Sequence, residues 1–177
     1  MSGQDQLAGT LAINAAEAER LGSPFYASLC RSMADDTLSG GPTWKLLGKY
    51  ADEPVDAYYA FRLLGGAHRM VLDGEAPELA KHYGSVGGDG DAKAAWRQLR
   101  ELIATQQSTI FGYLDHPMQT NEVARSGAMV GGFLTVAEQT GLPLRLLELG
   151  SSAGLNLRFD KFRYESGTEG FGPVDSP

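Results

Sequence analysis

The chain has 177 residues, 42% of them hydrophobic, and a net charge of −7 at pH 7. This length suits one globular domain, or one domain with part of a second. The negative charge opposes binding to nucleic acid or to an anionic membrane surface. No apolar run approaches the roughly 18 residues of a membrane span, and no charged-then-apolar leader opens the chain. We therefore expect a cytoplasmic protein with neither a nucleic-acid nor a membrane partner.

Apolar residues recur at helical spacing up to about residue 141. Ser23-Pro24 is typical of a helix start, since serine caps the helix and proline lacks the amide that the first turn would leave unpaired. Gly65-Gly66 interrupts a later helix and predicts a kink or a close helix crossing. The glycine-rich stretch 84–91 predicts a flexible loop. The predicted helices span residues 4–21, 24–38, 43–50, 56–72, 77–83, 91–114 and 120–139.

The hydrophobic period changes after Pro143. Leu144-Arg-Leu-Leu-Glu-Leu149 is a short, mostly apolar run that ends at Gly150, and it predicts a buried strand. Ser151 or Ser152 could cap a following helix of about eight residues. The expected fold class is therefore mainly α: a helical domain over residues 1–141, then the first β–α unit of a Rossmann-like α/β domain over residues 142–177.

The glycine-rich turn after this strand fits two motifs poorly. A phosphate-cradling loop needs a lysine after its last glycine, but Leu155-Asn156 follow Gly154. A nucleophile elbow would place Ser152 as the nucleophile, with a histidine later in the chain. The histidines His68, His82 and His116 all precede Ser152, so a hydrolase of that type is disfavoured.

The spacing Glu148-x-Gly150-x-Ser152-x-Gly154 resembles the first motif of S-adenosylmethionine-dependent methyltransferases. A strand end would deliver Glu148 to the sheet edge where ligands bind. The glycines let a ligand approach the backbone, and Ser151 with the helix N-terminus offers donors to a carboxylate. The same kind of turn also joins strands to helices with nothing bound. The resemblance implies S-adenosylmethionine as the cofactor, with these cofactor-binding residues: Glu148, Gly150, Ser151, Ser152, Gly154 and Asn156.

A longer stretch resembles an uncharacterised bacterial family. Its signature is Q-T-N-E-V-x-R followed by L-L-E-[LI]-G-[AS]-S-A-G-L-N-L, and the likeness is close over residues 113–166. The resemblance implies a methyltransferase-like architecture without an established reaction. It places Gln119, Asn121, Glu122 and Arg125 at the start of the helix before the strand. Asn121 and Glu122 could cap that helix, or they and Arg125 could contact substrate or cofactor; Glu122 and Arg125 could also form an ordinary surface pair.

The chain offers fewer strands than the six or seven of a methyltransferase core. The strand at 144–149 could pair with residues 162–165, with its own copy in a homodimer, or with residues beyond Pro177. We expect the third case, in which this chain is the amino-terminal part of a longer protein and is inactive by itself.

Two functional hypotheses remain. The first is an S-adenosylmethionine-dependent methyltransferase-like protein that acts on a small molecule. The second is a non-catalytic helical module for binding or oligomerisation. We expect no metal site, since the histidines lack ligand spacing, and we expect Cys30 to be a buried structural thiol.

Overall fold

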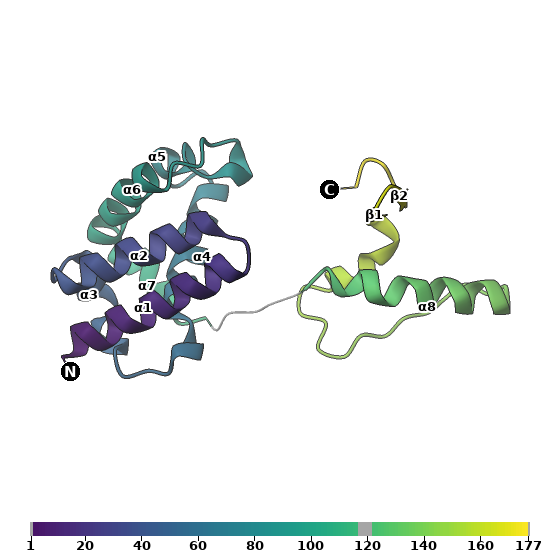
Figure 1. Ribbon diagram of the computed structural model, residues 1–177, viewed down its shortest axis with the longest axis horizontal. Coiled ribbons are helices and arrows are strands. Elements are labelled where there is room, and N and C mark those ends of the chain that lie inside the picture. Colours follow the sequence, from purple (N-terminus) through teal and green to yellow (C-terminus); the bar gives the residue numbers. More distant parts are fainter. Residues whose placement is uncertain (1, 117–121, 177) are drawn as a thin grey trace. The chain divides into compact units, whose positions relative to one another are not determined.

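The computed structural model describes residues 2–116 and 122–176. It forms two compact units, Met1–Met118 and Gln119–Pro177 (Figure 1). The described chain is mainly helical, as the sequence predicts. The helix that the sequence assigns to the end of the first domain lies in the second unit.

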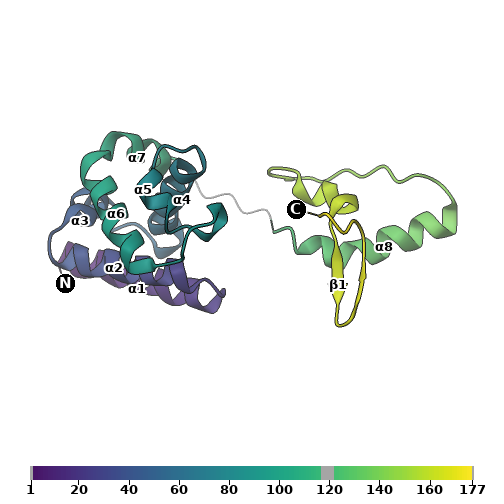
Figure 2. The ribbon, with the colours of Figure 1, turned by 90° about the horizontal axis from the view of Figure 1, so that it is seen from above.

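In residues 2–116, all regular secondary structure of the first unit is helical. Helices α1 and α2 form a hairpin and lie side by side, as Figures 1 and 2 show. A capping box starts α1, in which Ser2 and Asp5 exchange hydrogen bonds. Helix α6 packs against α2 and α3, and α7 packs against α4. The bounds are α1 Gly3–Arg20, α2 Pro24–Leu38, α3 Pro42–Leu47, η1 Gly48–Tyr50, η2 Val55–Ala57, α4 Tyr59–Leu72, α5 Pro77–Ala80, η3 Gly84–Val86, α6 Ala92–Thr105 and α7 Gln107–Leu114.

These helices close over one apolar core. Among its fully buried side chains are Leu11, Leu29, Met33, Leu47 and Leu99. Cys30 is buried among them, which confirms the prediction of a buried thiol. Burial raises the pKa of the Cys30 thiol to about 12, so the thiol stays protonated at neutral pH.

Two sequence predictions about this unit have different outcomes. The close crossing at the glycine pair is confirmed at Gly66, where an added Cβ would lie 2.7 Å from the ring of Tyr113 on α7. The single helix over 91–114 is wrong, because it breaks at Gln106 into α6 and α7. The two halves pack against different helices, and no glycine or proline marks the break.

The second unit holds helix α8 (Arg125–Thr140), the 3-10 helix η4 (Leu155–Lys161) and the strands β1 (Tyr164–Ser166) and β2 (Glu169–Phe171). The strands form an antiparallel hairpin with Glu165 opposite Gly170. The segment after α8 runs back along the helix in both ribbon views (Figures 1 and 2).

The prediction of a buried strand over 144–149 is wrong for the described structure. This segment has no regular secondary structure, and Leu147 and Leu149 are 88% and 89% exposed. A strand requires a backbone partner, and none of the described residues supplies one. Exposure nevertheless alternates from residue to residue along this segment. Leu144, Leu146 and Glu148 are half-buried, while the residues between them are exposed. In the described residues the only sheet is the β1–β2 hairpin, so they contain no parallel sheet of the Rossmann type.

Candidate functional site

The turn at residues 150–154 has a left-handed backbone at every position of the glycine motif. The angle φ is +68° at Gly150, +51° at Ser152 and +71° at Gly154. Glycine adopts such angles freely, whereas a residue with an L side chain adopts them at a cost in free energy. Gly150 and Gly154 therefore match the backbone geometry that the turn adopts, whereas Ser152 does not. A hydrogen bond of 2.7 Å from Gly154 N–H to the carbonyl of Ser151 closes the turn.

The two glycines of this turn face open space among the described residues. A Cβ built at Gly150 or at Gly154 would meet no atom within 4 Å. The two glycines are therefore not required for internal packing of the described structure. Their faces remain accessible to a ligand.

A network of polar side chains lies beside the turn. Ser126 Oγ donates to Asn156 Oδ1 at 3.1 Å, and Asn156 Nδ2 donates to Oε1 of Glu148 at 3.4 Å. Ser126 and Asn156 are buried. Among the described residues nothing donates to Oε2 of Glu148, although this oxygen is shielded from solvent. Such an oxygen is costly unless a donor reaches it. A ligand's N–H or O–H group would reach Oε2 only if the Glu148 side chain turned toward the cavity that it lines.

Two adjoining hollows flank this network. The one beside Glu148 and Asn156 has a volume of about 270 Å³ and is otherwise walled by apolar side chains: Met129, Phe133, Leu146, Leu147 and Leu157. The second measures about 530 Å³ and shares Phe133, Leu146 and Leu157 with the first. An apolar hollow with a few convergent polar groups is typical of a small-molecule site.

The residues that line the first hollow offer some of the chemistry that an adenosyl ligand would need. Glu148 offers an acceptor for an ammonium or hydroxyl group, and Phe133 and Met129 offer an apolar wall. The turn glycines follow Glu148 in the chain but do not line either hollow.

The structure brings together some of the residues that the sequence singles out. Glu148 and Asn156 are in contact, and the turn adjoins them. Ser151 and Ser152 do not cap the next helix, because η4 begins after Gly154 and has no side-chain cap; that prediction is wrong. Asn121 lies outside the described residues.

The other two predicted contact residues lie apart from the hollow. Glu122 and Arg125 are exposed, and neither lines the cavity beside Glu148. Their backbones are joined, with Arg125 N–H donating to the Glu122 carbonyl at 3.2 Å, at the start of α8.

Ser126 is a site residue that the sequence analysis missed. It shares a face of α8 with Met129, Val130 and Phe133, which follow it by three, four and seven positions. A small polar residue within an otherwise apolar stripe is the signal that could have identified it.

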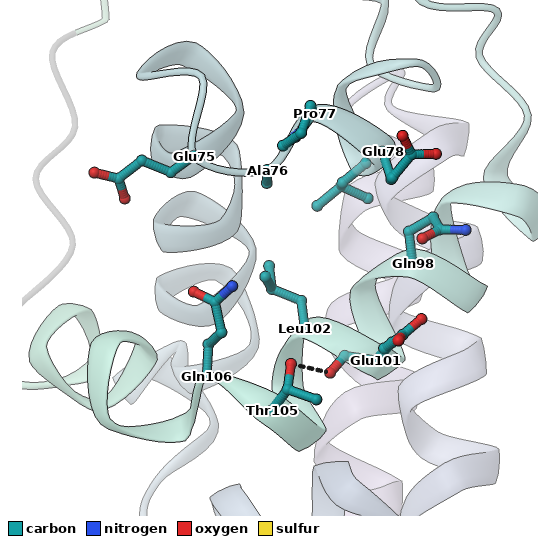
Figure 3. Close-up of a pocket in the computed structure, with 10 residues that line it drawn as sticks. Glu75, Ala76, Pro77, Glu78, Gln98, Glu101, Leu102, Thr105 and Gln106 are labelled. Carbon is teal, nitrogen blue, oxygen red and sulfur yellow. Dashed lines mark hydrogen bonds between the residues drawn. The ribbon is translucent and has the colours of Figure 1, made fainter.

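The first unit has a polar hollow between α5 and α6, with a volume of about 240 Å³. Figure 3 shows that Glu75 and Glu78 on its rim point away from one another. Glu78 is paired with Lys81 at 2.6 Å. In the residues that the structure describes, no group of three or more His, Cys, Asp or Glu side chains could hold a metal ion. This hollow therefore lacks the convergent chemistry of the site around Glu148.

The helices carry no sign of a membrane span. Throughout residues 2–116 and 122–176, none is both long and apolar enough to cross a bilayer.

Comparison with known proteins yields one match. The model of a family described as an uncharacterized protein conserved in bacteria (DUF2332) matches residues 9–177, which confirms the resemblance to an uncharacterised bacterial family. No curated protein and no solved structure matches the chain.

Proposed function

We propose that this chain, which belongs to the uncharacterised bacterial family DUF2332, binds S-adenosylmethionine at the turn 150–154 and contributes to methyl transfer onto a small molecule. The observation that carries the proposal is the Glu148 carboxylate, which lines a cavity and has one oxygen without a donor among the described residues. It lies beside a turn whose motif positions are all left-handed. An adenosyl ligand supplies both an ammonium group and ribose hydroxyls, which are the donors that such a carboxylate lacks.

Each residue has a distinct part in the proposal. Glu148 accepts a donor from the ligand, and Asn156 holds the carboxylate in place through its 3.4 Å contact with Oε1. Ser126 in turn orients the Asn156 amide. Gly150 and Gly154 leave room for the ligand against the backbone.

The chemistry requires little from the protein beyond alignment. S-adenosylmethionine supplies an electrophilic methyl group on a sulfonium sulfur, and a nucleophile displaces the sulfur directly. Holding the two reactants in line removes much of the entropic barrier to such a step. The apolar wall of Phe133, Leu146 and Leu157 would exclude water from that line.

Isothermal titration with S-adenosylmethionine and its demethylated product tests the proposal. The protein to use is the product of the whole reading frame that contains residues 1–177. We expect saturable heat with both ligands at or below millimolar concentration, and its loss in Gly154→Val, whose side chain occupies the open face of the turn. The proposal fails if neither ligand produces heat at millimolar concentration.

A second candidate function rests on a different observation. Leu142, Leu147 and Leu149 are 65%, 88% and 89% exposed in the segment beside the turn. Exposed leucines so close together are typical of a contact surface. A non-catalytic binding module would use them and would keep the turn for structure alone. In that case Gly154→Val, if it remains folded, would leave the cellular function intact.

A further inference from the structure

A chain of hydrogen bonds joins a serine, a histidine and a tyrosine in the first unit. Ser85 Oγ lies 2.7 Å from Nε2 of His68, and Nδ1 of His68 lies 2.9 Å from Oη of Tyr26. Ser85 belongs to η3, His68 to α4 and Tyr26 to α2. In nucleophilic catalysis a base takes the proton of a hydroxyl while a third group orients the base. We propose that Ser85 is a nucleophile that His68 activates for the cleavage of small esters.

The turn that carries Ser85 is fixed on one side and open on the other. Gly88 N–H donates to the carbonyl of Tyr83 at 2.9 Å, and a Cβ at Gly88 would lie 2.5 Å from Tyr83 N. Gly88 therefore packs directly on the backbone and holds the turn. Gly84 and Gly87 face open space, since a Cβ at either would meet no atom within 4 Å. Ser85 itself is exposed, so a substrate can reach Oγ.

The two contacts of His68 are compatible with the tautomer that the reaction needs. Nε2 of His68 must hold a lone pair to accept the Ser85 proton, so the reaction requires the ring hydrogen on Nδ1, where Tyr26 Oη can accept it. Burial lowers the pKa of His68, which keeps the ring neutral at pH 7. The ring of Tyr83 packs against His68 with 4.9 Å between ring centres and limits its rotation.

The proposed reaction is an ordinary acyl transfer to water. Ser85 Oγ bonds to the ester carbonyl carbon and its proton moves to His68 Nε2. The bond from that carbon to the alcohol oxygen then breaks, and the alcohol leaves with the proton from Nε2. Water attacks the acyl-serine with His68 again accepting the proton, which returns to Ser85 Oγ as the carboxylic acid departs.

Labelling of the whole chain with a fluorophosphonate, followed by peptide mass analysis, tests the nucleophile. We expect one adduct, at Ser85, that is absent in Ser85→Ala. His68→Gln should slow labelling by about 100-fold or more, whereas the control His82→Gln should stay within about twofold of wild type. The proposal is overturned if wild type forms no adduct at Ser85, or if His68→Gln labels as fast as wild type while its circular dichroism is unchanged.

Turnover of p-nitrophenyl acetate tests the activity itself. We expect the wild type to hydrolyse this ester and Ser85→Ala to lose the activity. Absence of Ser85-dependent turnover in wild type would reject the esterase activity. This result does not depend on S-adenosylmethionine binding in the second unit.

Discussion

Asp36 on α2 forms an ion pair with Arg100 on α6, with 2.7 Å between Oδ1 and Nε. Its other oxygen accepts the N–H of Thr43 at 2.8 Å, at the start of α3. The Asp36 side chain is only 5% exposed, whereas Arg100 is half-exposed. One carboxylate therefore joins three helices of the first unit.

Asp36→Ala should destabilise the first unit by about 2–3 kcal/mol, because it leaves a buried N–H unpaired and removes the partner of Arg100. Urea denaturation followed by tryptophan fluorescence measures the change. Asp35→Ala is the matched control, since Asp35 is exposed, and should cost less than about 0.5 kcal/mol. Equal losses in the two variants would contradict this role of Asp36.

Alanine substitutions at the two adjacent glycines of α4 should change the stability of the protein in opposite directions. Gly66→Ala places a methyl group against the Tyr113 ring and should cost about 1–3 kcal/mol through overpacking. Gly65 faces open space, so Gly65→Ala should gain about 0.5–1 kcal/mol from helix propensity. Thermal melts of both variants check this prediction. A stabilised Gly66→Ala variant would show that the α4–α7 crossing is not tight.

The stability of the first unit should decrease in mild acid. Because burial lowers the pKa of His68, the unfolded chain binds a proton at this site more readily than the folded protein. The contribution of His68 to the stability of the folded protein should therefore be complete above its unfolded pKa of about 6.5. It should fall as the pH decreases toward the lower pKa that His68 has in the folded protein. Denaturation near pH 7.5 and near pH 5.5 should show this loss in wild type and a smaller loss in His68→Gln. The same loss in both proteins would show that another group is responsible.

Ser152 should be a strained position in the ligand turn. Its φ of +51° favours glycine, so Ser152→Gly should stabilise the turn by up to about 1 kcal/mol, whereas Ser152→Val should destabilise it. Hydrogen exchange of the amides of residues 150–157 reports the change. Ala153→Gly is the control, since Ala153 has no positive φ, and it should speed exchange slightly. Slower amide exchange in Ser152→Val than in the wild type would contradict the proposed strain at Ser152.

Local sequence signals predicted most of the first unit, and their failure at Gln106 has a tertiary cause. The local signal of Pro24 places the start of α2 correctly, and α2 has the expected bounds. The expected cap is wrong, because the Ser23 side chain makes no capping hydrogen bond. The break between α6 and α7 has no such local signal, because it follows from α6 packing on α2 and α3 while α7 packs on α4.

The site shows the same division between local and distant information. Glycines at 150 and 154 permit the positive φ angles found there, but glycine does not require them, since Gly65 and Gly66 lie within helix α4. The contact between Ser126 and Asn156 joins residues thirty positions apart, and no local pattern encodes it. The strand at 144–149 was predicted from its apolar run, but a strand also needs a neighbour for its backbone, which a hydrophobic pattern does not specify.

The role of Glu148 as the ligand's acceptor is tested most directly by titrating S-adenosylmethionine into Glu148→Gln. Glutamine keeps the size of the side chain but removes its charge. The loss of one charge-assisted hydrogen bond of about 1.5–3 kcal/mol should weaken binding about 10- to 150-fold. The matched control Glu138→Gln lies on an exposed position of α8 and should bind as wild type does. Equal affinity in the wild type and in Glu148→Gln would contradict the account.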